Sequence, residues 1–445
     1  MTQQPRTNRL GLFVQDAWKP LPNLTVNAGL RFDEDDVLDY AGNRIFKLSN
    51  EWQPRLGVAW DPQGDGKSRV SASYGRFYYA LPTTLTVIAY GSYIDASTYN
   101  FSPTALAHDP AAPRNSQVFG SLQAEPVQDN LKGIYQDEFT LGFDRTFGSG
   151  FSVGVRYTYR NLGRVIEDRC DLDPGYPEAR QNYCVIFNPG SDSPFSTGQG
   201  IHGCDGRYEL GTEGNPSESM CDSPALYPLP SMPAATRQYH AIEVVAKKQV
   251  KDVLFLQASY IYSRLTGNYD GAASNGFGTF LNAGAYVAQS WPGINADFDY
   301  AYVLTNADGR LFLDRPHSFR LDASYTTPFG LTAGFQGWLR SGAPISLLVV
   351  QGYYGTFATQ RGSEGRQPWD YDFSLQLQYA FKVSGVTVTV LAQGFNLLNR
   401  QTVIDTDQYA TYAPPIEPDY VNANYGKATG RRDPRSFRVG ARVSF

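Results

Sequence analysis

Segments that alternate apolar with polar side chains recur along this chain, and they constrain its fold more than any other feature. The last of them, FRVGARVSF from Phe437 to Phe445, alternates almost without exception and ends on an aromatic residue. Successive side chains of a β-strand point to opposite faces of its sheet, so this spacing predicts strands with one apolar and one polar face. The sequence therefore predicts an all-β chain whose sheet separates two unlike environments.

The second constraint is the absence of long apolar runs. A helix that crosses a bilayer needs about 20 consecutive apolar residues, whereas runs such as 347–350 are far shorter. A closed barrel is the other structure that satisfies every backbone polar group in lipid. The charge of -5 includes no basic block, which makes nucleic acid an unexpected partner. The composition therefore predicts an antiparallel transmembrane β-barrel.

Thirteen strands are expected from the alternation, with lengths typical of tilted strands that cross a membrane. They are predicted at 10–18, 24–32, 55–61, 69–79, 136–147, 151–160, 239–248, 253–263, 318–327, 331–341, 370–382, 386–399 and 435–445.

The connections between these strands alternate in length. Outer-membrane barrels have short turns on the periplasmic side and long loops outside, and barrels of the 22-strand type enclose a plugged lumen. The short connections are 19–23, 62–67, 147–150, 249–252, 328–330 and 383–385, and the long ones are 33–51, 80–135, 161–238, 264–317, 342–369 and 400–434. With the C-terminus in the periplasm, the first strand also descends, so about nine strands and any plug are expected outside this chain.

The start of the chain has no export signal. Residues 1–10 contain neither an apolar h-region nor a small-residue cleavage site. We therefore expect residues 1–445 to form the C-terminal part of a barrel, with plug and signal peptide absent. A deliberately shortened chain, a truncated gene model and the later part of a split gene are all open.

The two faces of the predicted barrel have different side chains. Aromatic residues near strand ends are expected to form girdles at the lipid headgroups, although cross-strand packing in a soluble β-sandwich or solenoid uses the same residue types. These aromatics are Trp18, Trp60, Tyr78, Tyr79, Tyr157, Tyr159, Tyr260, Tyr262 and Tyr325. The inward residues are expected to be Thr25, Asn27, Arg31, Arg69, Ser71, Ser73, Thr140, Asp144, Ser152, Arg156, Gln257, Ser259, Arg320, Asp322, Gln336, Arg340, Arg438 and Arg442.

Several segments resemble a known family. GLFVQDAW at 11–18 followed by LTVNAGLRFD at 24–33 is similar to a hairpin of TonB-dependent outer-membrane receptors. Further segments are similar to its Oar-like branch, in family order: PRLGVAWD at 54–61, YGRFY at 74–78, DRPHSF at 314–319, SGAP at 341–344, FNLLNR at 395–400 and DPRSF at 433–437. Each motif alone is weak, but together they span nearly the whole chain.

The resemblance implies a bacterial outer-membrane protein that takes up a ligand bound by its extracellular loops and plug. It implies three further partners: outer-membrane lipid, the TonB system through an N-terminal region outside this chain, and the barrel-assembly machinery, which would read the terminal strand ending in Phe445. Oar-like receptors usually carry an N-terminal carboxypeptidase-regulatory-like domain as well. Peptide, protein or glycan uptake and surface adhesion all remain open.

Four cysteines fall in one predicted outer loop. Cys170, Cys184, Cys204 and Cys221 are expected to form two disulfides that staple this loop, and sequential pairing is favoured among three connectivities because short closures form most readily. A metal site that includes His202 is the alternative, but the paired Cys-x2-4-Cys ligands of structural zinc are missing. No metal and no cofactor are expected.

Tyrosine-rich loop segments are the candidate ligand-binding residues, because tyrosine offers an amphipathic surface to sugars, peptides or chelates. They are Tyr90, Tyr93, Tyr99, Tyr353, Tyr354, Tyr409 and Tyr412, and the same side chains can instead pack the loops.

Acidic and histidine-containing segments carry weaker expectations. The run 33–36 and the residues Asp297, Asp299 and Asp308 suggest calcium, but without a spaced ligand ladder they are expected to be solvated. Asp314, Arg315 and His317 are expected to fix a strand entrance by hydrogen bonds. No nucleophile or metallohydrolase motif is present, so no catalytic residue is assigned and the chain is not expected to be an enzyme.

Two functions therefore compete. The first is an outer-membrane receptor barrel for TonB-dependent uptake of an unidentified ligand. The alternative is a passive porin-like or adhesin barrel without TonB coupling, and a remnant that cannot close is a third outcome.

Overall fold

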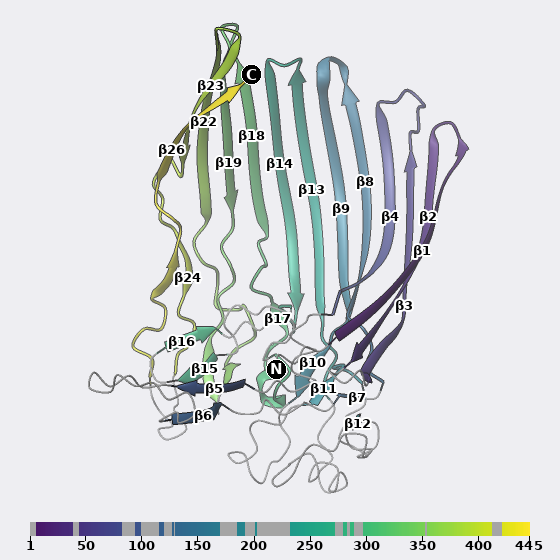
Figure 1. The fold of residues 1–445 in the computed structure, drawn as a ribbon, viewed down its shortest axis with the longest axis vertical. Helices are drawn as coiled ribbons and strands as arrows, with labels where there is room; N and C mark the ends of the chain where they lie inside the picture. Colours follow the sequence, from purple (N-terminus) through teal and green to yellow (C-terminus); the bar gives the residue numbers. More distant parts are fainter. Residues whose placement is uncertain are drawn as a thin grey trace, which may run out of the picture.

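One antiparallel sheet of consecutive strands makes up most of the molecule (Figure 1). The structure is a computed structural model, and it describes residues 6–38, 44–81, 94–98, 115–119, 127–128, 130–169, 185–191, 201–202, 232–271, 279–282, 285–288, 297–351, 354–411 and 421–445. Thirteen strands lie in chain order: β1 (Arg6–Leu21), β2 (Leu24–Leu38), β3 (Arg44–Trp60), β4 (Ser68–Tyr78), β8 (Tyr135–Phe147), β9 (Phe151–Arg164), β13 (Arg237–Val250), β14 (Leu254–Gly267), β18 (His317–Thr326), β19 (Leu331–Arg340), β22 (Asp370–Val383), β23 (Val386–Phe395) and β26 (Ser436–Ser444).

Shorter elements lie in the long connections. Strand β17 (Gly309–Arg310) pairs with the last two residues of β14, beyond the segment of β14 that pairs with β18. The remaining elements are β5 (Ile94–Thr98), β6 (Asn115–Phe119), β7 (Val127–Gln128), β10 (Glu167–Arg169), β11 (Val185–Phe187), β12 (Ile201–His202), β15 (Thr279–Asn282), β16 (Ala285–Ala288), β20 (Leu348–Gln351), β21 (Tyr354–Phe357), β24 (Val403–Thr406), β25 (Ala428–Arg431) and the 3-10 turns η1 (Gly148–Gly150) and η2 (Ala301–Leu304). Among the described residues, there is no helix of the length and apolar character needed to span a membrane.

The thirteen predicted strands are confirmed. The predicted alternation of short turns with long connections holds from β3 to β26, whereas the connection between β2 and β3 is itself short. A two-residue turn joins β22 to β23 through Ser384 and Gly385, whose φ angles are 50° and 84°. Two consecutive residues with positive φ form the turn whose twist matches the twist of a hairpin. Figure 1 shows the short turns at one end of the sheet and the long connections at the other.

Strands β2 and β3 extend further than predicted. The expectation of a loop at 33–51 is wrong, because β2 continues to Leu38 and β3 begins at Arg44. Asp33 stays opposite Gly11, and Asp35 stays opposite Arg9, in the ladder with β1. The acidic residues that suggested a loop therefore lie within a ladder of backbone hydrogen bonds.

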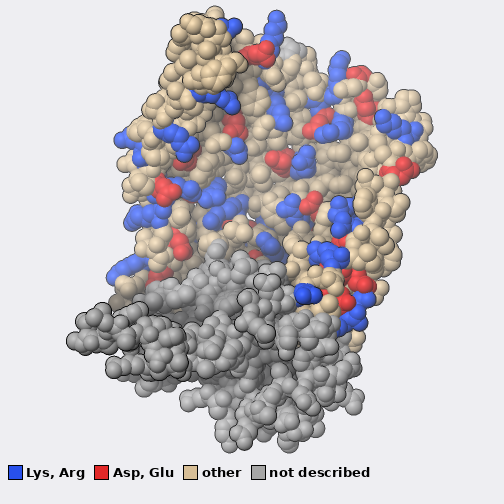
Figure 2. Space-filling model, in the orientation of Figure 1, with Lys and Arg blue, Asp and Glu red and all other residues tan. Residues whose placement is uncertain are grey.

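The polar side chains form rows that cross the sheet from strand to strand. One row runs from Ser152 to its partner Lys247, and then through Gln257, Asp322 and Gln336. The same register places all eighteen predicted inward residues on one face. This face is hollowed, and basic and acidic groups are interspersed over it (Figure 2).

The opposite face is apolar. Large side chains such as Leu141, Val244 and Val439 are 39–78% exposed there, as suits contact with lipid. Eight of the nine predicted girdle aromatics lie on this face by register. Tyr79 is the exception, because its hydroxyl donates to Gln136 Oε1 at 3.4 Å, and Gln136 belongs to the polar face. Since Tyr79 follows Tyr78 directly, alternation already placed it on the other face.

The sheet has two free edges that run in the same direction. Within the described residues, β1 pairs only with β2, and β26 pairs only with β23. Neighbours alternate in direction, so the first and thirteenth strands are parallel to each other. A single antiparallel barrel that closes over these edges must therefore add an odd number of strands.

The buried core lies in the long connections rather than in the sheet. One cluster joins Val37 and Leu48 of the β2–β3 extension to Val127 and Ile166. A second contains Phe187 and Phe298, and a third contains Leu348, Phe357 and Tyr409. The described parts of these connections thus pack into a layer of their own at one end of the sheet, which we call the loop layer (Figure 1).

The acidic run 33–36 is held by basic groups in this layer, so the expectation of a solvated surface is wrong. Asp35 is fully buried and pairs with Arg9, and Asp33 accepts from Arg31 Nε at 2.8 Å. Arg44 and Lys47 similarly hold Asp36 and Glu34. The basic partners come from β1, β2 and β3, and three strands are needed to assemble the network.

Glu51 is a carboxylate of this network that lacks a hydrogen-bond partner among the described residues. It lies in the β3 extension beyond the ring pair Phe32–Trp52 and is 1% exposed. Gly133 permits its position, because a Cβ there would lie 1.9 Å from Glu51 Oε1. Burial, and then the charge of Asp35, raise the pKa of Glu51 to about 7.

Replacing Glu51 by Gln should stabilise the β2–β3 extension at alkaline pH. The folded state keeps a proton that the unfolded state releases, so stability is present at low pH and falls as pH rises through about 7. Hydrogen exchange of the 44–51 amides at pH 8 should slow by at least about tenfold in Glu51→Gln and change little at pH 5.

Asp36→Asn is the matched control with the opposite sign. Its hydrogen bond from Arg44 lowers the pKa of Asp36, so its contribution is present at high pH and lost as pH falls. This variant should exchange faster at pH 8. If both variants changed amide exchange in the same direction at pH 8, the raised pKa of Glu51 and the lowered pKa of Asp36 would be contradicted.

The free edges give a second expectation. Residues 1–445 produced alone in detergent should associate through β1 and β26, because unpaired edges template pairing between chains. Light scattering should detect these oligomers. A monodisperse, heat-modifiable monomer of residues 1–445 would show that these edges close on themselves.

Candidate functional site

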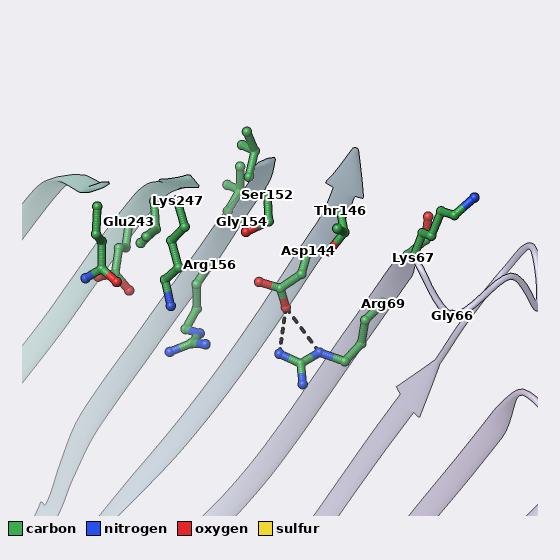
Figure 3. A pocket seen from close by; sticks show the side chains of 15 residues that line it. Gly66, Lys67, Arg69, Asp144, Thr146, Ser152, Gly154, Arg156, Glu243 and Lys247 are labelled. Carbon is green, nitrogen blue, oxygen red and sulfur yellow. Dashed lines mark hydrogen bonds and ion pairs between the residues drawn. The ribbon is translucent and has the colours of Figure 1, made fainter. Parts of the chain in front are cut away.

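A cavity in the polar face is the candidate functional site. Its volume is about 510 Å³, and strands β4, β8, β9, β13 and β14 form most of its wall (Figure 3). The lining residues are Gly66, Lys67, Ser68, Arg69, Asp144, Thr146, Ser152, Val153, Gly154, Val155, Arg156, Glu243, Val245, Lys247 and Gln257. Volumes of this order accommodate small ligands.

A missing side chain shapes the centre of the cavity. Gly154 lies opposite Asp144, and a Cβ on Gly154 would come within 2.5 Å of Asp144 Oδ1. The space admits the Asp144 carboxylate, which accepts from Arg69 Nη2 at 2.8 Å and Nε at 3.1 Å. Glycine at this inward position therefore lets a charged pair lie flat against the sheet.

The lining carries more positive than negative charge. Lys67, Arg69, Arg156 and Lys247 face two carboxylates, and one of these, Asp144, is already paired with Arg69. Arg156 and Lys247 are exposed and point into the same space from β9 and β13 (Figure 3). Glu243 lies directly opposite Arg156 in the ladder. This arrangement suits an anionic group or an acidic protein surface, with hydroxyls of Ser152 and Thr146 as additional donors.

Sequence reasoning predicted part of this cavity. Arg69, Asp144, Ser152, Arg156 and Gln257 were expected to face inward and are confirmed on its wall. Glu243 and Lys247 were missed, although they alternate with Val244 and Ala246 in the predicted strand. The cavity itself depends on the register of neighbouring strands, which the local pattern leaves open.

Further charged groups line the same face towards the β18–β26 side. Arg320 Nε donates to Asp322 at 2.8 Å, and Gln336 donates to the same carboxylate at 3.1 Å. Near the loop layer, Asp370 is buried and pairs with both Arg340 and Arg432. Most carboxylates of this face therefore have basic partners within the sheet.

The segment 314–317 fixes the entrance of β18, as predicted. Asp314 is 2% exposed, accepts from the backbone N–H of Leu265 at 2.7 Å, and pairs with Arg366. Arg315 offers its carbonyl to Ser263 at 2.9 Å, and burial lowers the pKa of its guanidinium to about 10. These bonds tie the connection to β14.

The acidic residues of the 264–317 connection are not solvated as a group. Asp297 and Asp299 are at most 7% exposed, and Asp297 lies 3.7 Å from Arg361, which also pairs with Asp270. Asp308 is exposed. Among the described residues, there is no group of three acidic, histidine or cysteine side chains able to hold a metal ion. Sequence reasoning missed Arg361 because its partners Asp270 and Asp297 lie far from it in the sequence.

Most loop residues singled out from the sequence lie outside the described residues. These are Cys170, Cys184, Cys204, Cys221, Tyr90, Tyr93, Tyr99, Tyr353 and Tyr412, together with the side chains of His202 and Tyr354. Tyr409 is described, and it is 7% exposed in the cluster with Leu348 and Phe357. Its ring packs the loop layer. Phe445 directly follows β26 and is fully exposed.

Comparisons with known proteins agree with this architecture. The family model of the outer membrane beta barrel domain matches residues 41–344. The TonB-dependent transporter Oar of Myxococcus xanthus is 24% identical over 98% of this chain and 42% of its own length. The chain therefore spans less than half of this curated relative.

Two solved structures share the fold. The outer membrane transporter YddB from Escherichia coli has a TM-score of 0.51 and 12% identity, over 98% of this chain and 54% of that chain. The FrpB iron transporter from Neisseria meningitidis, in its apoprotein form, has a TM-score of 0.51 and 12% identity, over 98% and 46%.

The matched domain covers more than half of the chain, and the resemblance to TonB-dependent receptors of the Oar-like branch is confirmed by the curated relative. The chain belongs to the outer membrane beta barrel domain family and is a protein of the bacterial outer membrane.

Proposed function

We propose that this chain is the barrel portion of a receptor that takes up a ligand through the outer membrane with energy from the TonB system. The observation that carries the proposal is the charged, hollowed face that thirteen strands present to one side. This face carries both paired and unpaired charged side chains. Such a surface suits the lumen of a receptor whose plug domain enters and leaves, because polar groups of the plug can form hydrogen bonds with it and release them.

The curated relative supports the proposed receptor function. It is named a TonB-dependent transporter, and its likeness extends along 98% of the chain. The odd number of strands still needed to close the sheet matches a barrel of about 22, which encloses a plugged lumen. The TonB machinery would act on a region preceding this chain, and the ligand would bind first at the loop layer.

The cavity gives the proposed lumen a preferred chemistry. Arg156 and Lys247 leave excess positive charge beside the Arg69–Asp144 pair. A carboxylate of a plug resting there, or of a ligand passing through, would complete the pairing. Charge-assisted hydrogen bonds of this kind are strong in the lumen and exchange readily with water once the plug moves.

Ion conductance of the complete protein tests the proposal against a passive pore. In a planar bilayer bathed in KCl, a barrel with an occupied lumen should show no steady open channel, whereas a passive porin conducts continuously. A steady conductance whose anion preference falls in the double variant Arg156→Gln, Lys247→Gln would establish the passive alternative, because those residues would then line an open pore.

The gene upstream of Met1 offers an independent check. A plug and a TonB box encoded in the same reading frame support the receptor. A signal peptide that leads directly into barrel strands would contradict energised uptake and favour the porin-like or adhesin function.

A further inference from the structure

A belt of aromatic and histidine side chains crosses the lipid-facing surface of β9, β13, β14 and β18 near the loop layer. The rings of Tyr159 and His240 are 4.7 Å apart, and those of Tyr262 and His317 are 5.4 Å apart. Tyr260 and His317 share a hydrogen bond of 2.8 Å. Amphipathic rings of this kind collect at the level of the lipid headgroups.

The position of the belt along β14 agrees with the thickness of a membrane. Lipid-facing residues begin at Leu254 and continue at every second position to Tyr262. A tilted strand rises roughly 20 Å over these eight steps, and roughly 25 Å up to Arg264, which is about the height of the apolar band of such barrels. Arg264 therefore lies at the outer boundary of the lipid-facing band.

Two arginines extend the lipid-facing surface beyond the belt. Arg264 lies directly opposite His240, and Arg310 of β17 lies opposite Thr266, two positions further along β14. Both side chains are exposed. Neither guanidinium has an ion pair or hydrogen bond with any residue in the described part of the chain.

Arg6 at the start of the edge strand β1 is also exposed on this surface and has no ion pair or hydrogen bond among the described residues, whereas Arg76, Arg145 and Arg435 have partners. Arg76 forms two hydrogen bonds with Asp137, at 2.8 and 2.9 Å. At the short-turn end, Arg145 donates to Gln63 Oε1 at 3.0 Å and also to Ser68. Arg435 donates to the Leu397 carbonyl at 3.3 Å and lies over the Phe437 ring. Arg264 and Arg310 thus differ from Arg76, Arg145 and Arg435 in having open donors, and both lie just outside the belt.

We propose that Arg264 and Arg310 bind the phosphate groups of lipid A in the outer leaflet. The outer leaflet of this membrane presents lipopolysaccharide, whose phosphates lie at the headgroup level, and arginine binds phosphate through parallel N–H donors. Two guanidinium groups on adjacent strands, two positions apart, form one short cationic row above rings that contact the sugar and acyl region. The row belongs to the outer surface and is independent of the lumen.

The test measures lipopolysaccharide bound to the complete receptor in phosphatidylethanolamine vesicles that contain lipopolysaccharide. Each of Arg264→Gln and Arg310→Gln should lower bound lipopolysaccharide by about fivefold, as expected for one basic residue at an anionic membrane surface. Arg264→Lys should retain part of the binding, because it keeps the charge and loses the paired donors. Heat-modifiable migration of every variant verifies that the barrel is folded.

Two comparisons identify the phosphate and the surface. Arg145→Gln removes an arginine from the same face at the short-turn end, and it should leave binding unchanged. With dephosphorylated lipid A, the unsubstituted receptor should bind no better than the double variant of Arg264 and Arg310. The proposal is overturned if the double variant binds phosphorylated lipid A normally, if Arg145→Gln is equally defective, or if the arginine dependence survives dephosphorylation.

Discussion

The ladder of backbone hydrogen bonds between neighbouring strands is the constraint on which the rest of this structure depends. In lipid, an unpaired N–H or C=O has no water to bond with, so each strand must be paired on both sides along its whole membrane-crossing length. Once the ladder is set, its register decides which side chains share a face. The polar row from Ser152 to Gln336 and the apolar surface behind it are both consequences of that one register.

This dependence explains how much the sequence could predict. Alternation is a local property, so the thirteen strands, their order and the inward residues followed from it. The extent of β2 and β3 did not, because their outer halves are held by Arg9, Arg44 and Lys47 rather than by an apolar face. Apolar–polar alternation no longer marks a strand where ion pairs, rather than apolar side chains, hold it to its neighbours. Contacts such as Arg361 with Asp270 join positions far apart and have no local signal.

The candidate site depends both on the local alternation of side chains and on contacts between distant parts of the chain. Individual members such as Arg69 and Asp144 were predicted from their strands, and the cavity appears only when five strands are placed side by side. Gly154 illustrates the difference, because its lack of a side chain matters only through its neighbour Asp144 on β8. The excess of positive charge is likewise a property of the assembled wall, and it gives the proposed lumen its preference for acidic partners.

The two free edges also bear on how such a barrel is made. Every join within the thirteen strands connects neighbours in the chain, and several are turns of only two to four residues. In the proposed receptor the seam that completes the barrel is different, because β26 would pair with a strand further away in sequence than any neighbour within this sheet. Loop-closure entropy grows with that separation. In that receptor, closing the seam would be the step that chain connectivity guides least, and its free energy would come from the ladder formed at the seam or from an external template for β26.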